Sequence, residues 1–241
     1  MKYKIVFLLF LYSAVSFAQK SRFSENETLY VWALNGLNMR KLPDAKSEKI
    51  AALPYGEKVT VQANIGIIVA HEVEEFKDFK VHGVWLLVKY GDKEGFVFDG
   101  YLSRLVAPEK NRKYSVDAYI KQNYKKIGKP SFSTYIDPNT IITITKKEYK
   151  DHSKGDGWYS YFYSSGIKDA TSFSENASGG ETFFDNSTLY EGYIFAKTIF
   201  SDIDFQYDKS DKKFILDDNE TCQFGIFMKG KKLIIKGGCN C

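Results

Sequence analysis

The stretch that decides the fold reads GLNMR at residues 36–40, KVTV at residues 58–61, WLLVKY at residues 85–90 and GFVF at residues 95–98. Polar and apolar residues alternate in KVTV, as they do in a strand with one buried face. WLLVKY precedes Gly91-Asp92, a frequent turn pair, and Gly56 and Gly95 stand where a tight turn or a close backbone approach would exclude a Cβ. Short strands separated by such turns predict a small β-barrel or sandwich.

In this order the pieces resemble the bacterial SH3-like (SH3b) domain, a small β-barrel common in envelope and secreted proteins. The resemblance runs over residues 29–105, within a domain expected at residues 29–106. It implies contact with cell-wall peptide or glycan, or with another envelope protein, in a groove near Tyr55, Trp85 and Tyr101. Each of these side chains could instead belong to the core, and Trp85 is predicted to matter more for stability than for binding.

The stretch departs from the family pattern between Val61 and Trp85, where about twenty additional residues intervene. A loop of this length is usually functional or carries structure of its own. The alternative is a longer hairpin of two extended strands.

Residues 1–18 have the features of a secretory signal peptide. Lys2 and Lys4 precede an apolar run, and Ser16-Phe17-Ala18 forms a small-x-small cleavage site. The formal net charge is +4, without a basic stripe, which argues against nucleic acid as a partner. We therefore expect an exported protein, periplasmic or extracellular, soluble and without a transmembrane segment once the signal is removed.

A second domain is predicted at residues 112–241, antiparallel and β-rich with one helix, so that the whole chain is mainly β. Linker composition at residues 107–111 predicts two separable units, residues 19–107 and 108–241. The helix is expected over residues 115–127, capped by Ser115 and stopped by Gly128 and Pro130. Period-two patterns predict strands at residues 141–145, 158–163, 190–200, 213–216, 222–228 and 232–236.

Catalytic motifs are missing from the sequence, and we predict no catalytic residue, no metal site and no cofactor. The only histidines are His71, His82 and His152, and the cysteines lack the setting of a papain-like nucleophile. A cysteine paired with His152 stays open as a minor alternative. The acidic residues near the C-terminus fit solvated turns better than a glycosidase pair; they are Asp202, Asp204, Asp208, Asp217, Asp218 and Glu220.

The aromatic run WYSYFY at residues 158–163 is a candidate binding surface. Alternation places Tyr159, Tyr161 and Tyr163 on one face of a strand. Facing solvent, they would suit stacking on a glycan or peptide. The favoured interpretation is that they are covered within the sheet.

Cys222 and Cys239 are predicted to form a disulfide. A two-residue turn at Gly230-Lys231 pairs Lys229 with Lys232, and counting outward brings residue 222 opposite residue 239. Cys222–Cys241 is the rival pairing.

These observations favour an exported, non-enzymatic binding or scaffold protein of the bacterial cell envelope. Two alternatives stay open. One is a cell-wall hydrolase whose site lies in the C-terminal domain, and the other is an inhibitor or immunity protein against a secreted enzyme or toxin.

Overall fold

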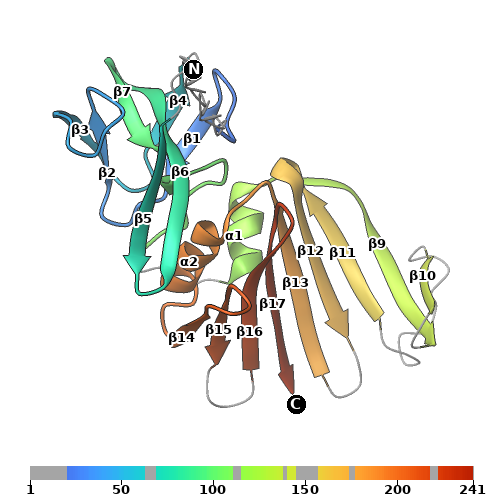
Figure 1. The fold of residues 1–241 in the computed structure, drawn as a ribbon. Helices are drawn as coiled ribbons and strands as arrows, with labels where there is room; N and C mark the ends of the chain where they lie inside the picture. The colour runs from blue at the N-terminus through green and yellow to red at the C-terminus, as the bar shows by residue number, and fades with distance from the viewer. Residues whose placement is uncertain are drawn as a thin grey trace, which may run out of the picture.

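The computed structural model describes residues 21–62, 69–110, 115–137, 140–144, 157–173, 177–217 and 222–240. It consists of two antiparallel sheets and two α-helices, which confirms the mainly-β class (Figure 1). The expected signal peptide lies outside the described residues.

The first sheet contains the SH3-like stretch. Its strands are β1 (Thr28–Val31), β2 (Leu37–Arg40), β3 (Lys49–Leu53), β4 (Lys58–Val61), β5 (Ala70–Phe76), β6 (Phe79–Tyr90), β7 (Lys93–Phe98) and β8 (Leu102–Ser103). They are ordered β3-β2-β7-β6-β4-β1-β8, with β5 paired to β6. Between β7 and β8 lies the 3-10 turn η1 (Asp99–Tyr101). No described pair joins β3 to β8, so the described strands form an open sheet and not the closed barrel that was predicted. Strand β8 has only two residues, and both pair with β1.

Two glycines allow the strands of this sheet to turn and approach. Gly56 has a φ of +86° in the turn before β4. A Cβ on Gly95 would lie 2.9 Å from the carbonyl oxygen of Arg40, so β7 can approach β2 only with glycine there.

The residues inserted before Trp85 form the long hairpin that was the alternative expectation, as far as the structure describes them. β5 pairs with the first half of β6, and the chain turns at Lys77-Asp78, where Asp78 has a φ of +68°. The tip of this hairpin reaches the second sheet near α2 (Figure 1). Residues 63–68 lie outside the description.

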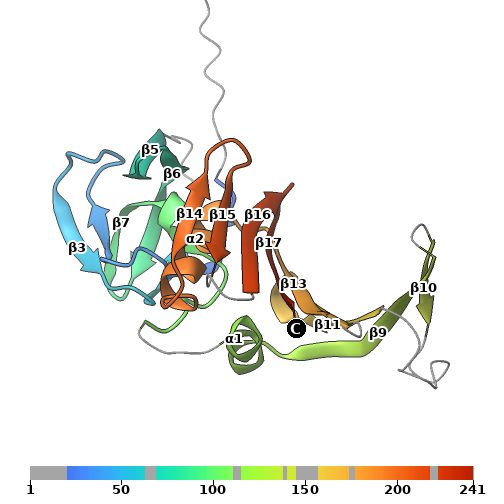
Figure 2. The same cartoon turned by 90° about the horizontal axis from the view of Figure 1, so that it is seen from below.

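The second sheet has nine strands in the order β10-β9-β11-β12-β13-β17-β16-β15-β14. The strands are β9 (Lys126–Asp137), β10 (Thr140–Ile144), β11 (Gly157–Tyr163), β12 (Ile167–Phe173), β13 (Ala177–Asp185), β14 (Phe205–Asp208), β15 (Lys213–Asp217), β16 (Cys222–Lys229) and β17 (Lys232–Asn240). Seen from below, the sheet bends strongly, and β9 and β10 reach away from the first sheet (Figure 2). The predicted strands are present except for residues 190–200, while β9, β12, β13 and β14 were not foreseen.

Helix α1 (Val116–Asn123) is shorter than predicted. The side chain of Ser115 caps it by accepting from the backbone N–H of Ala118 at 3.2 Å, as expected. The helix ends before Tyr124, which is already extended. Ile127 lies in β9, because its backbone pairs with Phe162 of β11 and so cannot continue the helix. Its side chain is 48% exposed.

Residues 190–200 are predicted as a strand, but most of them belong to a second helix. The structure therefore has two α-helices where the sequence predicts one. Helix α2 (Leu189–Thr198) begins with a capping box, in which the side chains of Thr188 and Glu191 bond each other's backbone N–H groups. All of Tyr190–Ala196 is buried. A helix buried all round shows no amphipathic period, and its aromatic, β-branched sequence therefore looked like a strand.

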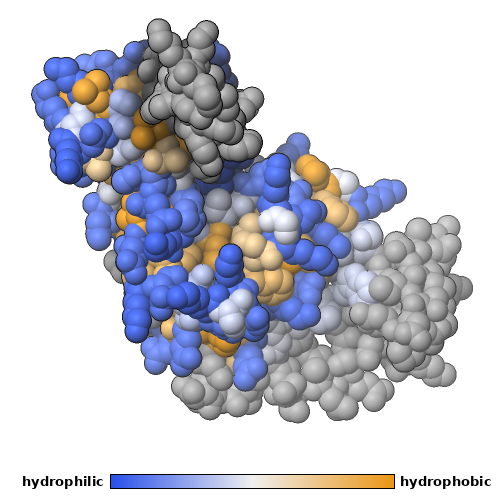
Figure 3. All heavy atoms as spheres, in the orientation of Figure 1, coloured by the Kyte–Doolittle hydropathy of each residue, from blue (hydrophilic) through white to orange (hydrophobic). Residues whose placement is uncertain are grey.

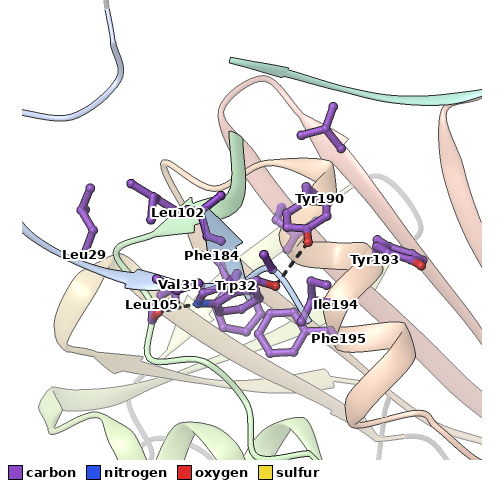
Figure 4. Packing of buried hydrophobic residues seen from close by; sticks show 14 of the residues in the cluster. Leu29, Val31, Trp32, Leu102, Leu105, Phe184, Tyr190, Tyr193, Ile194 and Phe195 are labelled. Carbon is purple, nitrogen blue, oxygen red and sulfur yellow. Dashed lines mark hydrogen bonds between the residues drawn. The ribbon is translucent and has the colours of Figure 1, made fainter. Parts of the chain in front are cut away.

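The two sheets share one apolar core, which does not break at the predicted domain boundary (Figure 4). Trp32 is fully buried, and its ring meets Phe195 of α2 edge-on at 5.3 Å. Phe79 of β6 packs 5.2 Å from Phe214 of β15. The limits 29–106 and 112–241 stay a prediction, but this continuity argues against separable folding.

The hairpin of β16 and β17 has the predicted register. Gly230 has a φ of +61°, Lys229 pairs with Lys232, and Cys222 lies opposite Cys239. The disulfide itself stays a prediction.

We expect non-reducing peptide mapping of the protein, purified without reductant, to recover a Cys222–Cys239 peptide. Closing this loop should stabilise the fold by about 3 kcal/mol, so the double Cys222→Ala, Cys239→Ala variant should unfold at lower urea concentration. A Cys239–Cys241 bridge, or three free thiols, would contradict the pairing.

Candidate functional site

Of the three residues predicted for a ligand groove, Trp85 is buried and Tyr55 and Tyr101 are partly buried. Trp85 is 7% exposed, and its ring lies 5.3 Å from that of His71. The hydroxyl of Tyr55 donates to the carbonyl of Pro108 at 2.8 Å. The ring of Tyr101 lies against that of Tyr190 in α2. Their role in binding stays a prediction.

Tyr101 is held by groups on both sides of the domain junction. Its hydroxyl donates to the carboxylate of Glu75 at 2.8 Å, and its ring lies 4.9 Å from that of Tyr190 in α2. Burial, and then the Glu75 carboxylate, raise the pKa of Tyr101. This tyrosine joins the two sheets.

Replacement of Trp85 by alanine is expected to destabilise the protein by about 3 kcal/mol while sparing ligand binding, because the indole is buried. Urea unfolding and a binding measurement on the same sample check both parts. The assignment would be reversed by a variant that melts like the wild type and no longer binds. Leu42→Ala, at a site 60% exposed, is the control for a neutral apolar truncation.

The strongest candidate site is a cleft of about 450 Å³ between the two sheets, hereafter the junction cleft. One wall is the run of consecutive residues from Asp78 to Val84 at the start of β6, and the floor includes Asp99 and Gly100. Across from them lie residues 188–190 at the start of α2. Tyr207 and the lysines Lys209 and Lys212, around the turn from β14 to β15, complete the lining together with Arg22. A volume of this size is within the usual range for small ligands or part of a peptide.

The floor carboxylate, Asp99, is a structural group. It is 4% exposed, and it accepts from the backbone N–H of Val84 at 2.7 Å and the hydroxyl of Ser21 at 2.9 Å. Burial raises its pKa despite these hydrogen bonds. Gly83 is required beside it, because a Cβ there would lie 2.7 Å from the backbone nitrogen of Gly100.

Glu191 follows the lining residue Tyr190 in the chain, and its side chain is 2% exposed. It accepts from the hydroxyl of Ser103 in β8 and from the backbone N–H of Thr188. The guanidinium of Arg22 lies 3.6 Å from it and also donates to the carbonyl of Leu102 at 2.6 Å. These contacts fix the start of α2 against the first sheet.

Cations outnumber carboxylates in the lining, and most of them are paired within the protein. Lys209 forms an ion pair with Asp78 at 2.9 Å, which lowers the pKa of Asp78. Lys80 binds Glu72 at 2.6 Å, and Arg22 is paired with Glu191 as described. For Lys212 no carboxylate partner occurs among the described residues. Its backbone in the turn has a φ of +51°, a value unusual for residues other than glycine or asparagine.

The tyrosines of β11 are largely covered, as the favoured interpretation expected. Tyr163 is 3% exposed, and Tyr161 is half-buried with the ammonium of Lys126 lying 3.6 Å from its ring centroid. On the opposite face Phe162 is 38% exposed. Other apolar side chains also show on the surface over this sheet (Figure 3).

Of the six acidic residues predicted to be solvated, three have side chains that the structure describes. Asp202 and Asp204 are exposed, and Asp208 organises the turn after β14 by accepting from the backbone N–H of Ser210 at 2.9 Å. Asp218, Glu220 and His152 lie outside the described residues, and the side chain of Asp217 is likewise not described. Nowhere in the described ranges do three His, Cys, Asp or Glu side chains converge as metal ligands would.

Sequence reasoning missed the junction cleft because its walls come from distant segments, β6 and α2. The one local signal was Thr188-x-x-Glu191, a capping box that marks a helix start. Lys209 and Lys212 have the appearance of ordinary turn residues in the sequence.

Comparison with known proteins identifies part of the chain. Residues 35–103 match the family model of the bacterial SH3 domain, which confirms the resemblance. The first sheet extends beyond this match at its N-terminal end, since β1 begins at Thr28. No curated protein matches the chain. No solved structure matches it either. Within the described residues, none of the helices has the length and apolar character needed to span a membrane.

Proposed function

Taking the bacterial SH3 domain as a binding module, we propose that this is an exported, non-enzymatic binding protein of the bacterial cell envelope. Its ligand is an acidic peptide, held in the junction cleft and carried by the cell wall or by another envelope protein. The carrying observation is that the hairpin inserted into the SH3 domain forms one wall of that cleft.

The charge of the cleft supports an acidic ligand. Arg22, Lys80 and Lys209 are balanced by carboxylates of the protein, and Lys212 is the cation left over among the described lining residues. One such cation suits a carboxylate better than a multiply charged phosphate, which Asp78 and Asp99 would repel. Apolar lining from Val81, Leu189 and Tyr190 suits the remainder of a peptide.

The lining also supports binding without catalysis. Asp78 is paired with Lys209, and both oxygens of Asp99 accept hydrogen bonds from the protein. Neither carboxylate is free to serve as one of the pair that a hydrolase would need.

Sedimentation with purified peptidoglycan sacculi tests the proposal. Retention should fall about fivefold in Lys212→Gln, the effect of one solvent-accessible ion pair, and stay unchanged in Lys231→Gln, an exposed turn lysine outside the cleft. Retention insensitive to Lys212 would refute the assignment of the cleft. If sacculi do not retain the protein, a soluble acidic peptide bound with the same Lys212 dependence identifies a protein source.

Zymography on cell walls separates the hydrolase alternative. Lysis that a single Asp or Glu substitution abolishes would overturn the non-enzymatic assignment.

A further inference from the structure

We propose that the junction cleft binds its ligand as an added β-strand, on the open edge of β6 at Lys80 and His82. This inference rests on the proposed function, in that the cleft is taken as the ligand site. It goes further by naming the partner class: an extended segment of a protein, recognised through its main chain.

The lining shows that the cleft follows a strand edge. Every residue from Phe79 to Val84 contributes to it, including residues on both faces of the strand. A cleft over a sheet face would take alternate residues only, since successive side chains point to opposite faces. In Figures 1 and 2 β6 lies between β5 and the second sheet, so its second edge points to the junction.

The register shows which backbone groups point to this edge. The backbone N–H of Trp85 donates to Val69, on the β5 side, whereas that of Val84 donates away from β5 to Asp99 at 2.7 Å. Backbone direction alternates along an antiparallel strand, so Val81 and Gly83 face β5, and Lys80 and His82 face the cleft.

The cleft-facing groups have no partner strand within the described part of the chain. The pairs that β6 makes with β4 and β7 begin at Trp85 or later. Asp99 occupies the outward N–H of Val84, which ends the open edge. Lys80 and His82 are left with a donor and an acceptor each, in the alternating pattern that an extended peptide matches.

The surroundings are those of a site for an added strand. The main-chain edge supplies hydrogen bonds, and Tyr190, Leu189 and Lys212 across the cleft can contact alternate side chains of the ligand. An exposed edge is normally an aggregation risk, and here the second domain and the Asp78–Lys209 pair limit access to it.

The test starts from randomised seven-residue L-peptides displayed on phage and selected on the full-length mature protein. A selected peptide is synthesised with each backbone amide N-methylated in turn, and its affinity is measured by calorimetry. N-methylation at alternate positions should weaken binding about tenfold or more, because each lost bond is made in a partly enclosed site, and the intervening positions should change it less than twofold. Equal effects at all positions, or no selected peptide that depends on the cleft, would overturn the inference.

A matched pair of protein variants gives a second readout. His82→Pro removes the outward N–H without touching the ladder to β5, and edge strands accept proline at such positions. His82→Ala removes the same side chain, including its 3.0 Å contact with Glu72, and keeps the N–H. We expect the proline variant to bind the selected peptide about tenfold or more weakly than the alanine variant, because the two differ in the backbone N–H and not in the loss of the imidazole. Should the proline variant fail to fold, the N-methyl scan decides alone.

The two proposals fail in different ways. Binding that needs Lys212 but shows no alternation in the N-methyl scan retains the cleft as the site and removes strand addition. Affinity that is unchanged in Lys212→Gln and in both His82 variants rules out the cleft as the ligand site.

Discussion

A fragment of residues 21–107, expressed without the rest of the chain, is expected to give no cooperative thermal transition. In the whole protein Trp32 is covered by Phe195, Phe79 by Phe214, and Tyr101 by Tyr190. Without the second domain these aromatic side chains face water, and a small domain has little surplus stability to offset that loss. Calorimetry and dye binding to exposed apolar surface check the result.

The matched control is the chain of residues 21–241, which should unfold in one transition because the sheets share a core. Linker composition near Pro108 predicts the opposite from sequence, namely two units that fold alone. A sharp transition of the fragment near that of the whole chain would show that the shared core is dispensable.

Replacement of Trp32 by alanine is expected to lower the free energy of unfolding by about 5 kcal/mol. The indole is fully buried, and its N–H donates to the carbonyl of Leu105 at 2.8 Å. Its removal leaves a cavity against Phe195 and an unpaired carbonyl. Urea unfolding measures the change.

Leu42→Ala is again the control, with an expected change within about 0.5 kcal/mol. If the free energy of unfolding of Trp32→Ala lies within about 1 kcal/mol of the wild-type value, the shared core can repack around the loss.

Local pattern was sufficient for two hairpins of this protein, β6–β7 and β16–β17. The turn at Gly91-Asp92 and the register around Gly230-Lys231 are both as predicted, because two-residue turns set the pairing of their strands. Pattern failed for α2, where burial on all sides removed the helical period.

The candidate site could not be predicted in the same way. The strand pattern predicts the burial of Trp85, and the structure confirms it; the contact of Tyr101 with Tyr190 of the second sheet's helix α2 has no signal in the sequence, and a role of Tyr101 in binding stays a prediction. The junction cleft depends on β6 meeting α2, residues about one hundred positions apart, and no local period encodes that meeting.

The shared core also sets an order for folding during synthesis. The hydroxyl of Tyr190 donates to the carbonyl of Trp32, which lies 158 positions earlier in the chain. The ring of Phe79 is covered only once Phe214 has been synthesised. A ribosome releases the N-terminal half first, so the SH3 strands must persist with uncovered aromatic side chains until β15 has emerged. Contacts of such long sequence separation form slowly, and the nascent chain is therefore accessible to chaperones throughout that interval.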